Sequence, residues 1–405
     1  MLAIKKVIFS GTFSFPFGDA AGERIKHLAI GMADHVHEVK VVSLYQNDLT
    51  ETFSPKGYFQ LNNHVIKFTS ILHGKRFNFS SNYSNRLKAR YYQILATRIL
   101  AETTLSQLSG SNDELLFLYG RSYFFLKIVL SGIKTRGLQT KVLFDVVEPP
   151  RLESNWFEYV KHPFTIDSSL VFKKLLIRFD ACTFISSKLC QDFGNGLKKQ
   201  MILPSVLSNI PDRQLTIENV NKPRFVYLGS LYEKDYPELL LRLGTLLEKN
   251  KIDFELIIMG RFKNVAEGRK WEEKFRVSTF ADKINFINNP DEHLKSQMIN
   301  TSHFICLFRK PEILQEYTFP TRVVELLSYG KVLVVNSFGD FKNYFHSGEN
   351  ALVIDELKID EILVQLKQLS DSREYKRISN SSVALLSGPF SASKQAMKLL
   401  QLLNN

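Results

Sequence analysis

The sequence predicts an α/β protein made of two doubly wound parallel-sheet domains. Short apolar runs recur along the chain and alternate with longer stretches of helical periodicity, the pattern of strand–helix–strand units. Two such series are separated by residues 205–223, a polar stretch that contains Pro211 and ends at Pro223. At 405 residues, 44% of them hydrophobic, the chain is long enough to bury two cores. We therefore expect two Rossmann-like domains.

Each apolar run is short enough to be a buried strand and is bounded by glycine or polar residues. The first series places strands at 5–11, 38–44, 114–119, 141–147 and 180–186, with a helix over 23–34. The second places strands at 223–230, 254–260, 283–288, 303–308, 331–336 and 351–355, with a helix over 237–249. The expected domains are 1–205 and 206–385, and the amphipathic segment 386–405 is expected to be a helix that packs back on the first domain.

The net charge of +12 lies almost entirely in the first half. Residues 1–205 hold 26 Lys and Arg against 16 Asp and Glu, whereas the rest hold 27 against 25. The first half is therefore expected either to face an anionic partner or simply to present a basic soluble surface.

No targeting, membrane-spanning or metal-binding signal is found. The chain has no run of about 18 apolar residues, and its start reads as a strand and not as a signal peptide. Its three cysteines form no CxxC pair, which fits a reducing cytoplasm. Phosphate-loop, HExxH, GxSxG, Asp-x-Asp and nucleic-acid-binding patterns are all missing. We expect no metal, no cofactor and no nucleic-acid partner.

Open α/β sheets bind ligands at the carboxyl ends of their strands, so the loops there are the candidate site. The first of these, Gly18 to Gly22, would let backbone amides approach a phosphate at a helix start. It is not a GxGxxG motif, so an ordinary βα turn stays open as the alternative.

A second candidate loop joins Gly229 and Ser230 to Lys234, just before a helix that starts near Pro237. A lysine beside a glycine turn and a helix start is suited to hold a diphosphate. A solvated loop lysine is the alternative.

The stretch YTFPTRVVELL, 317–327, puts an acid inside an apolar helix. Arg322 would add a positive charge beside an anion, and Glu325 could accept from two vicinal hydroxyls, as on a ribose. The alternative is a Glu–Arg pair within the helix, because the two residues are i,i+3 neighbours. The backbone amides expected to point at the anion are those of Thr318, Phe319 and Thr321.

Together these segments resemble a known family. YLGSLYEK, LIIMG, INFINN, FPTRVVELLSYGKVLVV and SGENALVID stand in the order and spacing of retaining GT-B glycosyltransferases of glycosyltransferase family 4. The resemblance covers roughly residues 170–355. A weaker match, FPFGDAAGERIKHLAIGMADHVHEVKVV, falls where that family has its glycine loop and first helix.

The resemblance implies a GT-B fold, with two Rossmann-like domains facing across a cleft. It also implies transfer of a hexosyl or N-acetylhexosaminyl group from a nucleoside-diphosphate sugar to an acceptor hydroxyl, with retention and without a metal. The expected product is a surface polysaccharide or glycolipid. The protein would then be cytoplasmic or peripheral on the inner face of the membrane.

The same resemblance assigns roles to single residues. Glu325 would hold the ribose, Lys234 and Arg322 would face the diphosphate, and Asn288 would lie near the base. Gly18 would approach the diphosphate from the other domain.

Two departures from the family pattern weaken these assignments. Ser230 replaces a frequent arginine, and Tyr317 stands where the first acid of a glutamate pair is expected. Glu316, one step away, becomes the candidate for contacting the sugar.

The acceptor side is predicted from the basic first half. Arg121 and Glu148 end two strands there. The stretch 73–100 interleaves aromatic side chains with cations, among them Lys75, Arg76, Arg86, Lys88 and Arg90. Such a segment can lie on an anionic membrane and would suit a polyprenol-linked or other saccharide acceptor. Alternatively, the helix packs its aromatics into its own domain.

Two other functions stay open on the same scaffold. A nucleotide-sugar epimerase would act without an acceptor. A catalytically silent partner would bind the donor without turnover.

Overall fold

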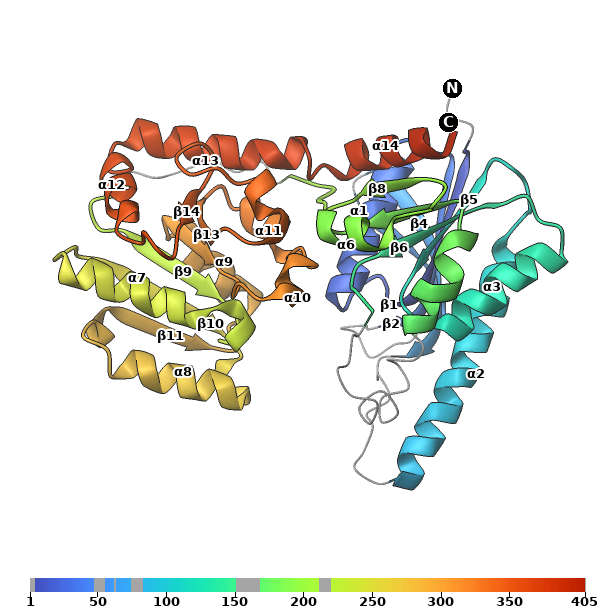
Figure 1. The fold of residues 1–405 in the computed structure, drawn as a ribbon, viewed down its shortest axis with the longest axis horizontal. Helices are drawn as coiled ribbons and strands as arrows, with labels where there is room; N and C mark the ends of the chain where they lie inside the picture. Colours follow the sequence, from blue (N-terminus) through green and yellow to red (C-terminus); the bar gives the residue numbers. More distant parts are fainter. Residues whose placement is uncertain are drawn as a thin grey trace. The chain divides into compact units, whose positions relative to one another are not determined.

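The computed structural model describes residues 4–46, 55–61, 63–73, 83–150, 168–210 and 220–404, with side chains left out over 73–90 and at 93. The chain forms two compact units (Figure 1). The first comprises Met1–Ser208 and Pro389–Asn405, and the second comprises Asn209–Gly388.

The first unit is built on an eight-stranded sheet in the order β3-β4-β2-β1-β5-β6-β7-β8. All neighbouring strands are parallel except the β3–β4 pair. The strands are β1 (Lys6–Ser14), β2 (Glu38–Gln46), β3 (Lys56–Leu61), β4 (His64–His73), β5 (Glu114–Tyr119), β6 (Lys141–Val146), β7 (Ala181–Phe184) and β8 (Gln200–Ile202). The helices are α1 (Ala20–Ala33), α2 (Tyr83–Gln107), α3 (Tyr123–Thr135), the π-helix η1 (Val171–Leu175), the 3₁₀ helix η2 (Leu176–Arg178), α6 (Ser187–Phe193) and α14 (Ala392–Asn404).

The second unit is built on a fully parallel six-stranded sheet in the order β11-β10-β9-β12-β13-β14. Its strands are β9 (Arg224–Leu228), β10 (Glu255–Gly260), β11 (Ile284–Asn288), β12 (Phe304–Leu307), β13 (Val332–Asn336) and β14 (Leu352–Ile354). Its α-helices are α7 (Pro237–Lys249), α8 (Ala266–Arg276), α9 (Glu292–Asn300), α10 (Ile313–Glu316), α11 (Arg322–Leu327), α12 (Glu361–Gln368) and α13 (Ser372–Ser387). Four 3₁₀ helices complete it, η3 (Glu233–Asp235), η4 (Phe262–Asn264), η5 (Ala281–Lys283) and η6 (Gly339–Asn343).

The predicted α/β class is confirmed for both units, and each predicted strand is present. Three strands were missed, β3, β4 and β8. In β3 every second side chain is exposed, and β8 has only three residues at a sheet edge, so neither forms the continuous apolar run of a buried strand. The strand β13, which lies between β12 and β14, is by contrast buried at all five positions.

The end of the chain returns to the first unit, where α14 packs against α1. A Cβ on Gly31 would lie 2.5 Å from the backbone of Ala392, so this close approach needs a glycine. His27 of α1 lies where the first unit ends, and the amide of Ser208 donates to its Nδ1 (3.3 Å). Burial, with the charge of Lys26, lowers the pKa of His27 to about 4, so the ring is neutral and free to accept.

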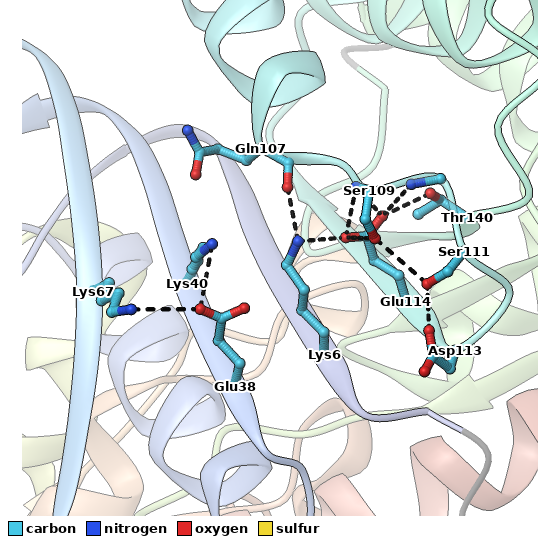
Figure 2. A network of polar contacts seen from close by, with 11 residues as sticks. Lys6, Glu38, Lys40, Lys67, Gln107, Ser109, Ser111, Asp113, Glu114 and Thr140 are labelled. Atoms are coloured by element: carbon cyan, nitrogen blue, oxygen red, sulfur yellow. Dashed lines mark hydrogen bonds and ion pairs between the residues drawn. The ribbon is translucent and has the colours of Figure 1, made fainter.

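A buried carboxylate ties together the amino ends of the first sheet (Figure 2). Glu114, at the start of β5, pairs with Lys6 of β1 at 2.6 Å and accepts from the Thr140 hydroxyl at 2.8 Å. The amide of Ser109 donates to both of its oxygens. Burial would raise the pKa of Glu114, but these donors together hold it below its ordinary value. This cluster is structural, since it lies at the edge opposite to the strands' carboxyl ends.

Candidate active site

Backbone hydrogen bonds join neighbouring strand ends at the carboxyl edge of the second sheet. The Gly229 amide donates to the carbonyl of Met259, and the Asn289 amide donates to that of Gly260, each at 2.8 Å. A Cβ on Gly260 would lie 1.9 Å from the Gly229 carbonyl oxygen, so only glycine fits where β9 and β10 end. The loops that leave this edge are therefore held in fixed positions.

The loop after β9 presents Lys234 to solvent on a strained backbone. Leu231 and Tyr236 flank it in left-handed conformations, with φ of 55° and 54°. Such strain in non-glycine residues concentrates at functional sites. The Lys310 amide donates to the carbonyl of Lys234 (3.0 Å), and no carboxylate of the described residues pairs with the Lys234 ammonium, which lies 5.5 Å from the ring centre of Tyr232.

Two further cations at this edge form ion pairs with acids of the loop that carries Lys234. Arg309 pairs with Asp235 at 2.5 Å, and Lys310 pairs with Glu233 at 3.0 Å. Both follow β12, and both hold the Lys234 loop in place. The sequence alone could not identify their partners, because Asp235 and Glu233 lie more than seventy residues away on another loop.

Arg322 joins the start of α11 to the end of β9. Its guanidinium donates to the carbonyl of Leu228 at 2.7 Å, next to Gly229, and the side chain is otherwise exposed. No described carboxylate pairs with it. Arg322, Gly229 and Ser230 are thus brought together, with Lys234 on the same loop as the latter two.

Glu325 differs from its predicted surroundings. It is 46% exposed, whereas its apolar neighbours on α11 are buried. It does not pair with Arg322, which binds a carbonyl instead, and its partner is Lys295 of α9 at 2.7 Å. Burial would lower the pKa of Lys295, but the hydrogen bond and charge of Glu325, together with Glu292, raise it.

The expected cluster of amides before α11 is only partly available. The prediction for Thr318 is wrong, because its amide donates to the carbonyl of Gln315 (3.2 Å). Phe319 is buried against Phe341 and anchors the turn, with ring centres 5.4 Å apart. Thr321 precedes α11 as its N-cap residue and makes no side-chain capping bond.

Glu316 and Asn288 each bind a neighbouring backbone amide. An oxygen of Glu316, at the end of α10, accepts from the Gly339 amide at 3.1 Å. Tyr317, which stands where the family pattern expects an acid, is buried. The acid of this turn is therefore Glu316. Asn288 is exposed at the end of β11 and accepts from the Lys263 amide at 3.2 Å.

The first unit has polar groups of its own at strand ends. Arg121 pairs with Glu148 at 2.5 Å and lies half-buried. Asp145 is fully buried in an ion pair with Arg24 at 2.8 Å and also accepts from Thr183. Gly18 is exposed in the loop between β1 and α1.

The basic and aromatic segment of the first unit is only partly described. Lys75 and Arg76 lie outside the described residues, and Arg86, Lys88 and Arg90 lie in α2 with their side chains undescribed. The later part of α2 exposes large apolar residues, namely Tyr91, Tyr92, Ile94, Leu95 and Ile99. Of the aromatic residues in this segment, Tyr91 and Tyr92 are therefore not buried in their own domain.

Among the described residues, no helix is both long and apolar enough to cross a membrane. Within the same residues, no group of three or more His, Cys, Asp or Glu side chains is placed to hold a metal ion.

Solved structures similar to this chain share its whole fold at low identity. One, described as trehalose-6-phosphate from E. coli bound with UDP-2-fluoro glucose, is 13% identical with a TM-score of 0.63, covering 99% of both chains. A sucrose-phosphate synthase from Thermosynechococcus elongatus is 11% identical with a TM-score of 0.64, covering 99% of this chain and 98% of its own. No curated protein matches the chain.

Residues 210–382 match the family described as Glycosyl transferases group 1. They fall within the second unit, which carries Lys234, Arg322 and Glu325. The second unit therefore carries a glycosyl transferases group 1 domain, and the chain has a two-domain α/β fold of the GT-B type.

Proposed function

We propose that this protein is a glycosyltransferase that moves a sugar from a nucleoside-diphosphate sugar to a hydroxyl of a saccharide or lipid-linked acceptor. We further propose that the reaction proceeds with retention and without a metal, in the synthesis of a surface polysaccharide or glycolipid. The observation that carries the proposal is the pair of cations at the carboxyl edge of the second sheet, Lys234 and Arg322. Neither pairs with a carboxylate of the described residues. Arg322 binds the carbonyl next to Gly229, and Lys234 lies on the loop that follows Gly229.

These cations suit a departing diphosphate. In the reaction the bond between the anomeric carbon and the diphosphate oxygen breaks, and the acceptor oxygen bonds to that carbon. The acceptor proton ends on the diphosphate or in solvent. Negative charge grows on the diphosphate, and fixed cations stabilise it most where they need no rearrangement. Arg322 is fixed by its bond to Leu228. The loop that carries Lys234 is held by the ion pairs of its two neighbours, Glu233 and Asp235.

Glu325 is proposed to bind the donor ribose, with Lys295 holding its carboxylate in place. One oxygen of Glu325 accepts from Lys295. At 46% exposure, the carboxylate remains accessible to a ligand hydroxyl. The E. coli neighbour is described as bound with UDP-2-fluoro glucose, so UDP-glucose is the first donor to try.

Glu325→Ala is expected to weaken donor binding by roughly 10- to 100-fold, the effect of losing hydrogen bonds to a charged group. Isothermal titration of the donor measures this. Glu292→Ala is the matched control, because Glu292 is the other carboxylate on Lys295 (3.2 Å) but is 86% exposed. It should leave donor affinity unchanged. Unchanged affinity in Glu325→Ala would refute the ribose assignment.

The reaction itself is tested with radiolabelled donor, candidate acceptors and a chelator. Labelled glycoside with the donor's anomeric configuration, formed equally with chelator present, supports the proposal. Conversion of the donor sugar without acceptor would favour the epimerase, and donor binding without turnover would favour the silent partner.

We also propose that α2 contacts an anionic membrane, which would bring a lipid-linked acceptor to the enzyme. Its exposed apolar residues include Ile94 at 54% and Leu95 and Ile99 at 42%. The same helix carries basic residues on its earlier turns, and anionic lipid complements both features.

The variant Leu95→Ser/Ile99→Ser is expected to bind vesicles of phosphatidylglycerol and phosphatidylcholine several-fold less than the wild type in co-sedimentation. Val277→Ser, which changes an 86% exposed residue of the second unit, is the control. Equal sedimentation of all three proteins would contradict the assignment of α2.

A further inference from the structure

The first unit contains a large cavity at the amino edge of its sheet. It measures about 900 Å³ and opens at the amino ends of β6 and β7, whereas ligands of such sheets bind at the carboxyl ends. Its walls come from the end of α3, the segment around Arg178, the turn before β8 and the last turn of α14. None of the described residues predicted for the donor or the acceptor lines it.

The lining is strongly cationic. Five basic residues line the cavity, Lys134, Lys141, Arg178, Lys198 and Lys199, against one acid, Asp180. That acid is already used, since one oxygen accepts from the Val142 amide at 2.9 Å and the other lies 3.6 Å from Lys198. Among the described residues, the cavity therefore carries an excess of four positive charges, five minus one.

Two of the five basic residues bind the end of helix α14, and the others do not. The ammonium groups of Lys141 and Lys199 both donate to the carbonyl of Leu403, at 2.9 and 3.5 Å, which is favourable at a helix C-terminus. Lys134 and Arg178 make no such contact, and no described carboxylate pairs with either of them.

The shape and the apolar wall define the class of ligand. A volume of about 900 Å³ exceeds a bare phosphate and falls within the range of small-molecule sites. Leu130, Ile133 and Leu138 give the cavity an apolar side. A second cavity of about 480 Å³, mainly apolar, lies along α3 and shares Ser131 with the first.

We propose that this cavity binds a phosphate-bearing ligand, the phosphate held by Lys134, Arg178 and Lys198 and the organic part lying against the apolar wall. Cations that converge on a partly enclosed space raise the local potential and bind phosphate oxygens through charge-assisted hydrogen bonds. A soluble organic phosphate and a phosphorylated lipid share this chemistry. The site is independent of the proposed donor site.

The test compares Lys134→Gln/Arg178→Gln with the control Lys173→Gln/Lys174→Gln, which changes two exposed lysines of η1 that do not line the cavity. Both are made in an Arg322→Ala background, which weakens any diphosphate binding at the donor site. Pyrophosphate is titrated calorimetrically, and vesicles containing phosphatidic acid are sedimented. Circular dichroism checks that each variant is folded, as expected for exposed side chains.

Loss of at least tenfold in affinity in the Lys134/Arg178 variant alone would support the site. A loss of affinity for pyrophosphate would indicate that the ligand is a soluble phosphate. A loss of affinity for the vesicles alone would indicate that it is a lipid. Equal binding by both variants, or no binding of either probe by the Arg322→Ala parent, would overturn the proposal.

Discussion

Arg322→Ala is expected to lower kcat/KM for sugar transfer by about 10²–10³-fold, the usual effect of removing one fixed donor from a developing anion. The guanidinium is held at the end of β9 by its bond to Leu228 and has no described carboxylate to neutralise it. Its charge is thus available for a diphosphate. Initial rates with donor and acceptor both varied give the effect.

Two further variants make this prediction specific. Arg322→Lys should recover only part of the rate, because an ammonium cannot span the Leu228 carbonyl and a phosphate as a planar guanidinium can. Arg373→Ala, at a 90% exposed arginine of α13, should leave the rate unchanged. A rate in Arg322→Ala within twofold of the wild type would remove this residue from the mechanism.

Asp145→Ala is expected to destabilise the first unit by about 3–5 kcal/mol, because it leaves the guanidinium of Arg24 buried without its counter-charge. The two side chains are 1% and 0% exposed and are joined by two hydrogen bonds of 2.8 and 3.1 Å. Arg24 also donates to the carbonyls of Leu203 and Pro204, so the pair fixes α1 to the segment after β8. Urea unfolding, followed by far-UV circular dichroism, measures the loss.

A surface pair provides the control. Lys188 and Asp192 pair at 2.8 Å on α6, with 38% and 27% of their side chains exposed. Asp192→Ala should cost no more than about 1 kcal/mol, as exposed pairs generally do. If Asp145→Ala cost no more than Asp192→Ala, the buried pair would not be holding this unit together.

Much of the fold could be predicted from the sequence because most strands, such as β12 and β13, are buried on both faces. Each run such as 331–336 stands out from its neighbours without knowledge of any partner. Strand β3 could not be found this way, since its alternate residues face solvent and its pairing partner β4 only becomes evident in space.

The candidate site could be predicted as a set of loops but not as a set of contacts. Arg322 and Lys234 are recognisable because they sit in glycine-containing turns beside strand ends. The partner of Glu325 cannot be recognised in the sequence, because Lys295 is thirty residues away on another helix and no pattern marks it. Arg24 and Asp145, 121 residues apart, are hidden for the same reason.

The central claim is that the carboxyl edge of the second sheet binds a nucleoside-diphosphate sugar. The most direct measurement is thermal stabilisation of the wild type and of Arg322→Ala by UDP, GDP, dTDP, ADP and CMP and their common sugars. Ligand at about 100 times its dissociation constant adds roughly 2.7 kcal/mol. We predict a rise in Tm with one base only, lost or strongly reduced in Arg322→Ala. No rise with any nucleotide, or an equal rise in both proteins, would contradict the claim.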